Sequence, residues 1–252
     1  MKLSVIIIAR DAEATIRRCL ESVAWADEIV VVENGSGDRT AEICRELGAK
    51  MHQTEDWPGF GPQKNRALER AAGEWVLSLD TDEWISPELR AAIEVAIRDT
   101  HDKVAFRMPR LSSFCGRPMR HSGWWPDYGT RLFRRGRARF SDDLVHERVI
   151  ADGPVGRLGP ALHHEAVRSL EQILAKINAY SSAGAENMRR AGRRGSLAGA
   201  LWHGCWAFFR TYVLRAGFLD GREGLMLAVC DFEVTYYRYL KLMLLAEKQA
   251  SR

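Results

Sequence analysis

The sequence lacks the signatures of several protein classes. Its 252 residues contain neither a Gly-x-Gly-x-x-Gly nor a Walker pattern, which disfavours a dinucleotide-binding fold and a P-loop enzyme. The five cysteines are scattered, odd in number and without Cys-x-x-Cys spacing, so neither a disulfide framework nor a zinc site is predicted. No nucleic-acid recognition motif, internal repeat or low-complexity tract occurs. The first residues run directly into an apolar stretch without the basic start and cleavage site of a signal peptide, so we expect no export.

The composition is that of a soluble globular protein with an uneven distribution of charge. Apolar residues make up 46% of the chain and charged residues 28%, which are ordinary values for a folded domain. The net charge is only +4, but arginines crowd residues 107–139 and 189–194. This distribution favours anionic partners, such as phosphates or an acidic membrane surface, over nucleic acid.

The first hundred residues alternate between strand and helix patterns. Apolar runs predict strands over 3–9, 28–32, 49–53 and 75–79. The helices between them are predicted to begin at caps provided by Asp11 and Asp38 and at a first turn containing Pro62, while Ser86 and Pro87 open a fourth helix. This order predicts an α/β fold with a mostly parallel central sheet, helices on both faces and a nucleotide-binding half.

One apolar run, over residues 75–79, ends abruptly in Asp80, Asp82 and Glu83. Ligands of open α/β sheets bind beyond the carboxyl ends of the strands, so these acids are expected to line a crevice. On an extended backbone, Asp80 and Asp82 would point the same way. A divalent cation that also bridges a diphosphate would relieve their repulsion. The alternative is a solvated acidic turn.

Two other predicted loops carry candidate ligand contacts. Glu33, at the end of the second predicted strand, can hydrogen-bond a base or a ribose. Lys64 and Arg66, at the start of the third predicted helix, add positive charge to the helix dipole and can hold a diphosphate. A turn with a helix cap and a solvated helix surface are the respective alternatives.

Residues 101–165 contain the features expected on the side of a second substrate. Trp124, Trp125 and Tyr128 are typical of a wall on which a sugar stacks, although ordinary core packing would also explain them. A second group of acids runs from 142 to 147, and within it Glu147 has the apolar neighbours of a pocket residue. Three histidines nearby are candidates for orienting a base or completing a metal shell, with a hydrogen-bonded structural role as the alternative: His146, His163 and His164.

The chain changes character after residue 165. An apolar helical stripe is followed by the arginines of 189–194 and then by a tryptophan-rich apolar run over 197–214. The run has about the length of a short membrane span but contains Arg210, so we expect it to lie at the interface of an anionic membrane rather than to cross it. A helical lid on the catalytic domain or a dimer face is the alternative.

Several motifs together resemble the inverting family-2 glycosyltransferases, which have the GT-A fold. These are Leu3-Ser4-Val5-Ile6-Ile7, Val31-Val32-Glu33-Asn34-Gly35-Ser36 with Asp38 and Thr40, Asn65, and Leu79-Asp80-Thr81-Asp82-Glu83. Others look like the bacterial lipopolysaccharide core glycosyltransferases: the stretch 57–65, Gly123-Trp124-Trp125-Pro126-Asp127, Arg131-Leu132-Phe133-Arg134, Val145-His146-Glu147 and Phe218-Leu219-Asp220-Gly221. The chain departs from the family at Glu33, where Asp is usual, and at Thr81, where a small residue such as Ala is usual.

The resemblance implies an organisation and a set of roles. Residues 1–165 would form the GT-A catalytic domain, with a nucleotide-sugar half (1–100) and an acceptor half (101–165), and residues 166–252 a helical, membrane-associating region. The donor would contact Ala9, Arg10, Glu33, Lys64, Asn65, Arg66 and Asp80. A divalent metal, Mg²⁺ or Mn²⁺, would be held by Asp82 with Asp80 and His164. Glu147 would be the catalytic base, and the acceptor would contact Trp124, Trp125, Asp127 and Arg131.

The resemblance also implies a reaction and a location. We expect a metal-dependent transfer of a hexose, glucose from UDP-glucose, onto an inner-core sugar of lipopolysaccharide at the cytoplasmic face of the bacterial inner membrane. A capsule, exopolysaccharide or other lipid-linked glycan is the alternative acceptor. From other classes, a sugar nucleotidyltransferase is disfavoured because residues 9–11 offer no glycine-rich loop, and a non-catalytic membrane adaptor is disfavoured by the intact acids. Nucleic acid is not an expected partner, and the oligomeric state stays open.

Overall fold

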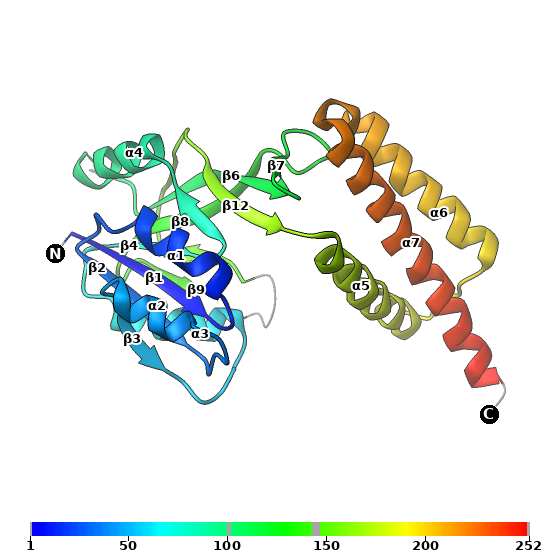
Figure 1. Cartoon of the computed structure of the whole chain (residues 1–252), viewed down its shortest axis with the longest axis horizontal. Coiled ribbons are helices and arrows are strands. Elements are labelled where there is room, and N and C mark those ends of the chain that lie inside the picture. Colours follow the sequence, from blue (N-terminus) through cyan, green and yellow to red (C-terminus); the bar gives the residue numbers. More distant parts are fainter. Residues whose placement is uncertain (1, 100–101, 143–146, 251–252) are drawn as a thin grey trace. The chain divides into compact units, whose positions relative to one another are not determined.

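The computed structural model describes residues 2–99, 102–142 and 147–250 (Figure 1). The chain divides into two compact units. Unit 1 contains residues 1–110 and 127–164, and unit 2 contains residues 111–126 and 165–252. Segment 111–126, which is predicted to belong to the acceptor half, therefore lies in the helical unit.

The first half of the sheet in unit 1 is parallel, as predicted. Its strands lie in the order β3 (Lys50–Gln53), β2 (Glu28–Glu33), β1 (Leu3–Ala9) and β4 (Trp75–Leu79). Every residue of β1 and β4 is buried. Strands covered on both faces read as continuous apolar runs, which is why these two were visible in the sequence.

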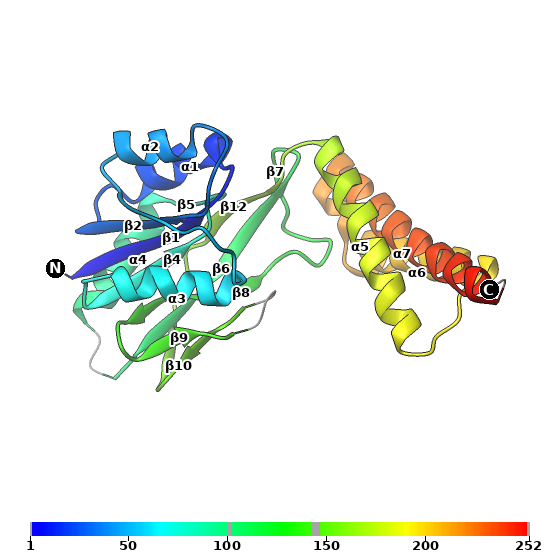
Figure 2. The same ribbon diagram turned by 90° about the horizontal axis from the view of Figure 1, so that it is seen from below.

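Helices cover both faces of this parallel half (Figure 2). On one face of the sheet, side chains of β1 and β4 share a core with residues of α1 (Glu13–Ser22), α2 (Thr40–Glu46) and α4 (Pro87–Arg98). The opposite core includes Ala67 of α3 (Phe60–Arg70). The predicted arrangement of helices on both faces is confirmed.

The helix starts differ in part from the prediction. Ser86 caps α4, as expected, by accepting a hydrogen bond from the Leu89 N–H. Asp11 does not cap α1, because it has a positive φ of 47° and accepts instead from the Gly37 N–H. Asp38 serves both helices, since its carboxylate accepts from the N–H of Glu13 in α1 and from that of Thr40 in α2.

The second half of the sheet is mainly antiparallel. It continues from β4 through β8 (Asp127–Arg134), β6 (Ala105–Phe114) and β12 (Leu162–Val167) to β5 (Glu83–Ile85). Two short strands pair with β6: β7 (Arg117–Pro118), which is antiparallel to its end, and β11 (Val155–Arg157), which is parallel to it. Two others, β9 (Ala138–Phe140) and β10 (Val149–Ala151), form a separate antiparallel pair. The sheet is therefore mixed, and its antiparallel half brings β5 and β8 to the end of β4.

Unit 2 is mainly helical. It contains α5 (Leu170–Arg190), α6 (Leu197–Phe209), a π-helical turn η1 (Arg210–Leu214), a 3₁₀ turn η2 (Gly217–Asp220) and α7 (Gly221–Ala250). Its core joins β6, β12, α5 and α7 through Phe114, Met119, Val167, Ile177, Leu227 and Cys230. Within the part of the chain that the structure describes, no helix combines the length and the apolar character needed to cross a membrane.

Candidate active site

The acidic residues after β4 form a tight turn. The Glu83 N–H donates to the Asp80 carbonyl at 3.0 Å, and the Asp80 N–H donates to the Glu83 carboxylate at 3.0 Å. The expectation that Asp80 and Asp82 point the same way from an extended backbone is therefore wrong. The turn separates them, and it leads directly into β5, where Glu83 is completely buried.

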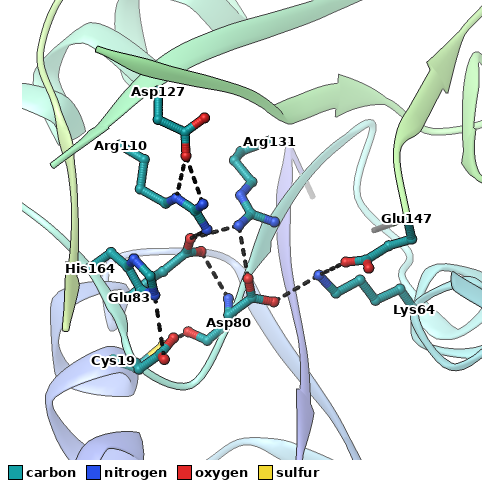
Figure 3. Close-up of polar contacts among 10 residues, drawn as sticks. Cys19, Lys64, Asp80, Glu83, Arg110, Asp127, Arg131, Glu147 and His164 are labelled. Carbon is teal, nitrogen blue, oxygen red and sulfur yellow. Dashed lines mark hydrogen bonds and ion pairs between the residues drawn. The ribbon is translucent and has the colours of Figure 1, made fainter. Parts of the chain in front are cut away.

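Arg131 of β8 binds two of these carboxylates. Its Nη2 lies 2.8 Å from Asp80 Oδ2 and 2.6 Å from Glu83 Oε1. Arg110 of β6 adds a second cation 3.7 Å from Glu83 and itself pairs with Asp127 at 2.7 Å. Figure 3 shows the two arginines above the acids. The predicted acceptor residues Arg131 and Asp127 thus belong to one chain of ion pairs that holds Asp80 and Glu83.

Lys64 of α3 connects this cluster to Glu147. Its Nζ lies 2.7 Å from Asp80 Oδ1 and 2.6 Å from Glu147 Oε1 (Figure 3). The Lys64 side chain is 3% exposed, so its ammonium has exchanged water for two carboxylates. A contact between Lys64 and a diphosphate, as predicted, would place the phosphate beside both acids.

The cluster shifts the proton affinities of its members. Burial favours the neutral form of Asp80, but attraction to Arg131 and Lys64 outweighs it and holds the pKa of this carboxyl well below its ordinary value. Burial raises the pKa of Glu83, and Arg131 offsets this only in part. Burial alone would lower the pKa of Arg131, but its attraction to Glu83 and Asp80 raises it. Asp80 is therefore an anion at neutral pH.

Asp82 faces a different partner. His164 of β12 lies in register with Glu83 of β5, and its Nε2 is 3.5 Å from Asp82 Oδ2. Among the described residues, no three side chains of His, Cys, Asp or Glu gather as a metal site would require. Asp82 and His164 nevertheless supply one oxygen and one imidazole nitrogen, a donor pair that fits a divalent ion whose remaining ligands come from phosphate and water.

The predicted base-binding residues lie at one edge of the sheet. Ala9 and Glu33 are register partners at the ends of β1 and β2. The buried Glu33 carboxylate accepts a short hydrogen bond from the Ser36 N–H, which closes the loop after β2. Arg10 follows Ala9 and is exposed beside Asp11. These positions are compatible with the predicted base contacts, which stay predictions.

Asn65 and Arg66 of α3 have partners within the protein. The Asn65 amide both donates to the Phe140 carbonyl and accepts from the Phe140 N–H. Arg66 forms a bidentate ion pair with Asp56 at 2.7 and 2.9 Å. A direct contact of either side chain with a donor would require these pairs to open.

The predicted acceptor residues fall in both units. Asp127 and Arg131 lie on β8 in unit 1, whereas Trp124 and Trp125 lie in unit 2. There Trp124 packs edge-on against Phe114, with ring centroids 6.0 Å apart, and Trp125 lies under the Arg120 guanidinium. The candidate His146 lies outside the described residues, as does Asp143 of the second group of acids.

Sequence reasoning missed one member of the cluster and underrated another. Arg110 is not among the predicted site residues. Glu83 is predicted to line a crevice with Asp80 and Asp82, which is wrong, because its side chain is fully buried. A signal was available, because each is a charged residue beside apolar residues of a strand. A buried charge in such a strand needs a partner of opposite sign.

Comparisons with known proteins agree with this fold. The sequence model of glycosyl transferase family 2 matches residues 4–152. An uncharacterized glycosyltransferase of Rickettsia bellii is 30% identical over 258 residues, covering 98% of this chain and 86% of the relative. The lipopolysaccharide core biosynthesis glycosyltransferase LpsC of Rhizobium meliloti is 29% identical over 258 residues, covering 95% and 93% of the two chains.

A solved structure supports the fold independently. TarS 1-349 of S. aureus, in complex with UDP-GlcNAc, superposes with a TM-score of 0.52 at 18% identity, covering 99% of this chain and 92% of that one. The resemblance to lipopolysaccharide core glycosyltransferases that the motifs indicated is confirmed by the similarity to LpsC. The chain belongs to glycosyl transferase family 2 and has the GT-A fold.

Proposed function

We propose that this chain transfers a hexose, glucose from UDP-glucose, onto an inner-core sugar of lipopolysaccharide with inversion at the anomeric carbon. The similarity to LpsC supports the acceptor class, and the UDP-GlcNAc bound to TarS supports a uridine nucleotide donor. One observation carries the mechanism. The Lys64 ammonium joins the donor-side Asp80 to Glu147, so acids for both sides of an inverting transfer lie next to each other.

Glu147 acts as the catalytic base. The acceptor hydroxyl oxygen attacks the anomeric carbon, the bond from that carbon to the diphosphate oxygen breaks, and the hydroxyl proton passes to Glu147. The Glu147 side chain is 16% exposed, which leaves it open to an acceptor while Lys64 fixes one of its oxygens. Asp80 cannot take this role because Arg131 and Lys64 occupy both of its oxygens.

The donor side is held by the turn after β4. Asp82, with His164 beside it, would hold Mg²⁺ or Mn²⁺. Asp80 would support the ion only if one of its ion pairs with Lys64 and Arg131 opened. A bound divalent ion there would neutralise the charge that develops on the departing diphosphate. Ala9, Arg10 and Glu33 contact the nucleoside. Lys64 and Arg66 add positive charge to the α3 terminus beside the diphosphate.

The lipid-anchored acceptor implies a location. We place the reaction at the cytoplasmic face of the bacterial inner membrane, where a nucleotide sugar and a nascent lipid-linked core meet. A capsule, exopolysaccharide or other lipid-linked glycan would use the same donor-side residues and differs only in the acceptor.

The test is to incubate the purified protein with a panel of nucleotide sugars, truncated core acceptors and other lipid-linked glycans, and to weigh the products. We expect one added hexose on an inner-core acceptor with UDP-glucose, in the presence of Mg²⁺ or Mn²⁺. A product only on another glycan would replace the acceptor. Neither transfer nor donor hydrolysis with any nucleotide sugar would favour a non-catalytic adaptor that retains the fold.

A further inference from the structure

Helix α6 buries its small residues and exposes its large ones. Its buried positions are Ala200, Gly204 and Ala207, and Thr211 of η1 continues the same spacing. These residues pack against α7 so closely that a Cβ on Gly204 would lie 2.9 Å from the Phe232 ring. In Figure 1 the two helices run side by side. A helix of a soluble domain normally turns its large apolar side chains toward the core.

The opposite side of this segment is strongly apolar and exposed. We call it the α6 face; its members are Trp202, Trp206, Phe209 and Val213, and Trp202 is the most exposed of them at 71%. Single exposed apolar residues are common, but a contiguous group of this kind marks an interaction surface.

The charged residues of the segment that carries the α6 face are all of one sign. No Asp or Glu occurs from residue 187 to residue 219, whereas Arg193 and Arg194 precede α6 and Arg210 and Arg215 follow it. None of the four arginines forms an ion pair within 4 Å in the described part of the chain. Asp231 of α7 attracts Arg210 and Arg215 only at longer range, and its carboxylate accepts the Thr211 hydroxyl.

We infer that the α6 face and its four arginines bind the surface of an anionic phospholipid bilayer. The tryptophan, phenylalanine and valine side chains of the face enter the boundary between headgroups and acyl chains, while arginines reach the phosphates. A second copy of this chain is a poorer occupant, because pairing two such faces brings eight arginines together without a carboxylate from either segment. The inference goes beyond the proposed reaction and does not depend on which sugar is transferred.

The experiment is co-sedimentation of the full chain with phosphatidylcholine vesicles, with and without phosphatidylglycerol. We expect binding only to the anionic vesicles, weakened by salt. Trp202→Ser with Trp206→Ser should reduce the partition coefficient at least tenfold. Arg193→Gln and Arg194→Gln should each reduce it roughly fivefold at low salt. The matched control is Leu174→Ala with Tyr180→Ala, two exposed residues of α5 outside the α6 face, which should bind as the unmodified protein does.

Several outcomes would overturn the inference. Equal binding to neutral and anionic vesicles would remove the role of the arginines, and unchanged binding by the tryptophan variant would remove the α6 face. If the unmodified protein forms a dimer, the tryptophan variant does not, and neither protein binds vesicles, then the α6 face is an interface between copies of this chain instead. Far-ultraviolet circular dichroism should show all variants folded. Transfer to a soluble acceptor should be unchanged in them, so failure of the proposed reaction and failure of membrane binding are told apart.

Discussion

The charges of the candidate active site have partners of opposite sign within the protein, whereas the arginines around the α6 face do not form ion pairs in the described structure. In unit 1, Lys64 and Arg131 lie within 2.8 Å of carboxylates, and Glu83 is fully buried among its partners. Around the α6 face, Arg193 and Arg194 stand in a segment without any acid. The first set of charges is balanced inside the molecule, and the second set is not.

This difference separates two uses of charge. A buried ion remains charged only when partners offset its loss of water, so the site cluster ties the positions of its members to one another. An exposed arginine keeps its water and loses nothing by lacking a partner. The cluster is therefore suited to hold catalytic groups in place, and the exposed arginines are suited to bind something outside the protein.

The largest effect is expected from removing one partner of the ion pairs in the candidate active site. Arg131→Met leaves Glu83 buried with only Arg110, 3.7 Å away, and should lower the free energy of unfolding by about 3–5 kcal/mol while abolishing transfer. Urea denaturation measures the first effect. Arg139→Met is the control, because its ion pair with Asp142 is 3.8 Å long and exposed, and it should change stability by less than about 0.5 kcal/mol. Equal denaturation midpoints for the two variants would contradict the role of Arg131.

The next effect concerns rate rather than stability. Glu147→Gln keeps the size of the side chain and a contact with Lys64 but cannot take a proton, so transfer should fall roughly a hundredfold with nearly unchanged donor affinity. Steady-state kinetics and donor titration separate the two quantities. Asp142→Asn, an exposed acid five positions earlier, is the control. Transfer at the unmodified rate by the Gln variant would move the base to Asp142 or Asp143.

The parallel half of the fold was predictable because its signals are local. Strands β1 and β4 are continuous apolar runs, and the start of α4 is marked by Ser86 and Pro87. The order of the antiparallel half was not, since β4 pairs with β8 and β5 pairs with β12, strands that are far apart in the chain, and β6 carries polar residues along its length. The order of β8, β6, β12 and β5 is a property of long-range pairing, on which periodicity gives no information.

At the site, residue types were predictable but their pairing was not. The resemblance pointed to Asp80, Lys64, Arg131 and Glu147, yet it assigned Arg131 to the acceptor. Only the turn from Asp80 to Glu83 and the position of β8 show that Arg131 lies against the acids. For α6 the apolar run was visible in the sequence. The burial of its small residues and exposure of its large ones could not be predicted, because they follow from the contact of Gly204 with α7.

A third effect should come from Asp82, the acid of the turn that faces His164 rather than the arginines. Asp82→Asn removes the oxygen that the proposed metal site needs while leaving the ion pairs of Asp80 intact, so donor binding in the presence of Mn²⁺ should weaken at least about tenfold with the fold unchanged. Isothermal titration with UDP, with and without Mn²⁺, measures this. Full transfer activity of the unmodified protein in excess chelator would refute metal dependence.

A smaller effect follows from the lowered pKa of Asp80. A carboxyl whose pKa is lower in the folded than in the unfolded state adds stability above its unfolded pKa of about 3.9, and this contribution is lost as pH falls through the folded value. The free energy of unfolding should therefore fall on acidification below about pH 4, and by less in Asp80→Asn. Urea denaturation at a series of pH values gives both curves, and parallel curves would show that Asp80 is not the group responsible.

The smallest effect on stability is expected where the charges are unpaired. Arg193→Gln with Arg194→Gln removes two positive charges between α5 and α6 that form no ion pair in the described structure. The free energy of unfolding should therefore stay within about 0.5 kcal/mol of the unmodified value. The same urea denaturation applies, beside Arg131→Met as the sensitive reference. A clear loss of stability would mean that these arginines have partners within the protein, and the contrast with the active-site cluster would then be wrong. An unchanged midpoint, together with weaker binding to anionic vesicles, would show charges that act on an external partner alone.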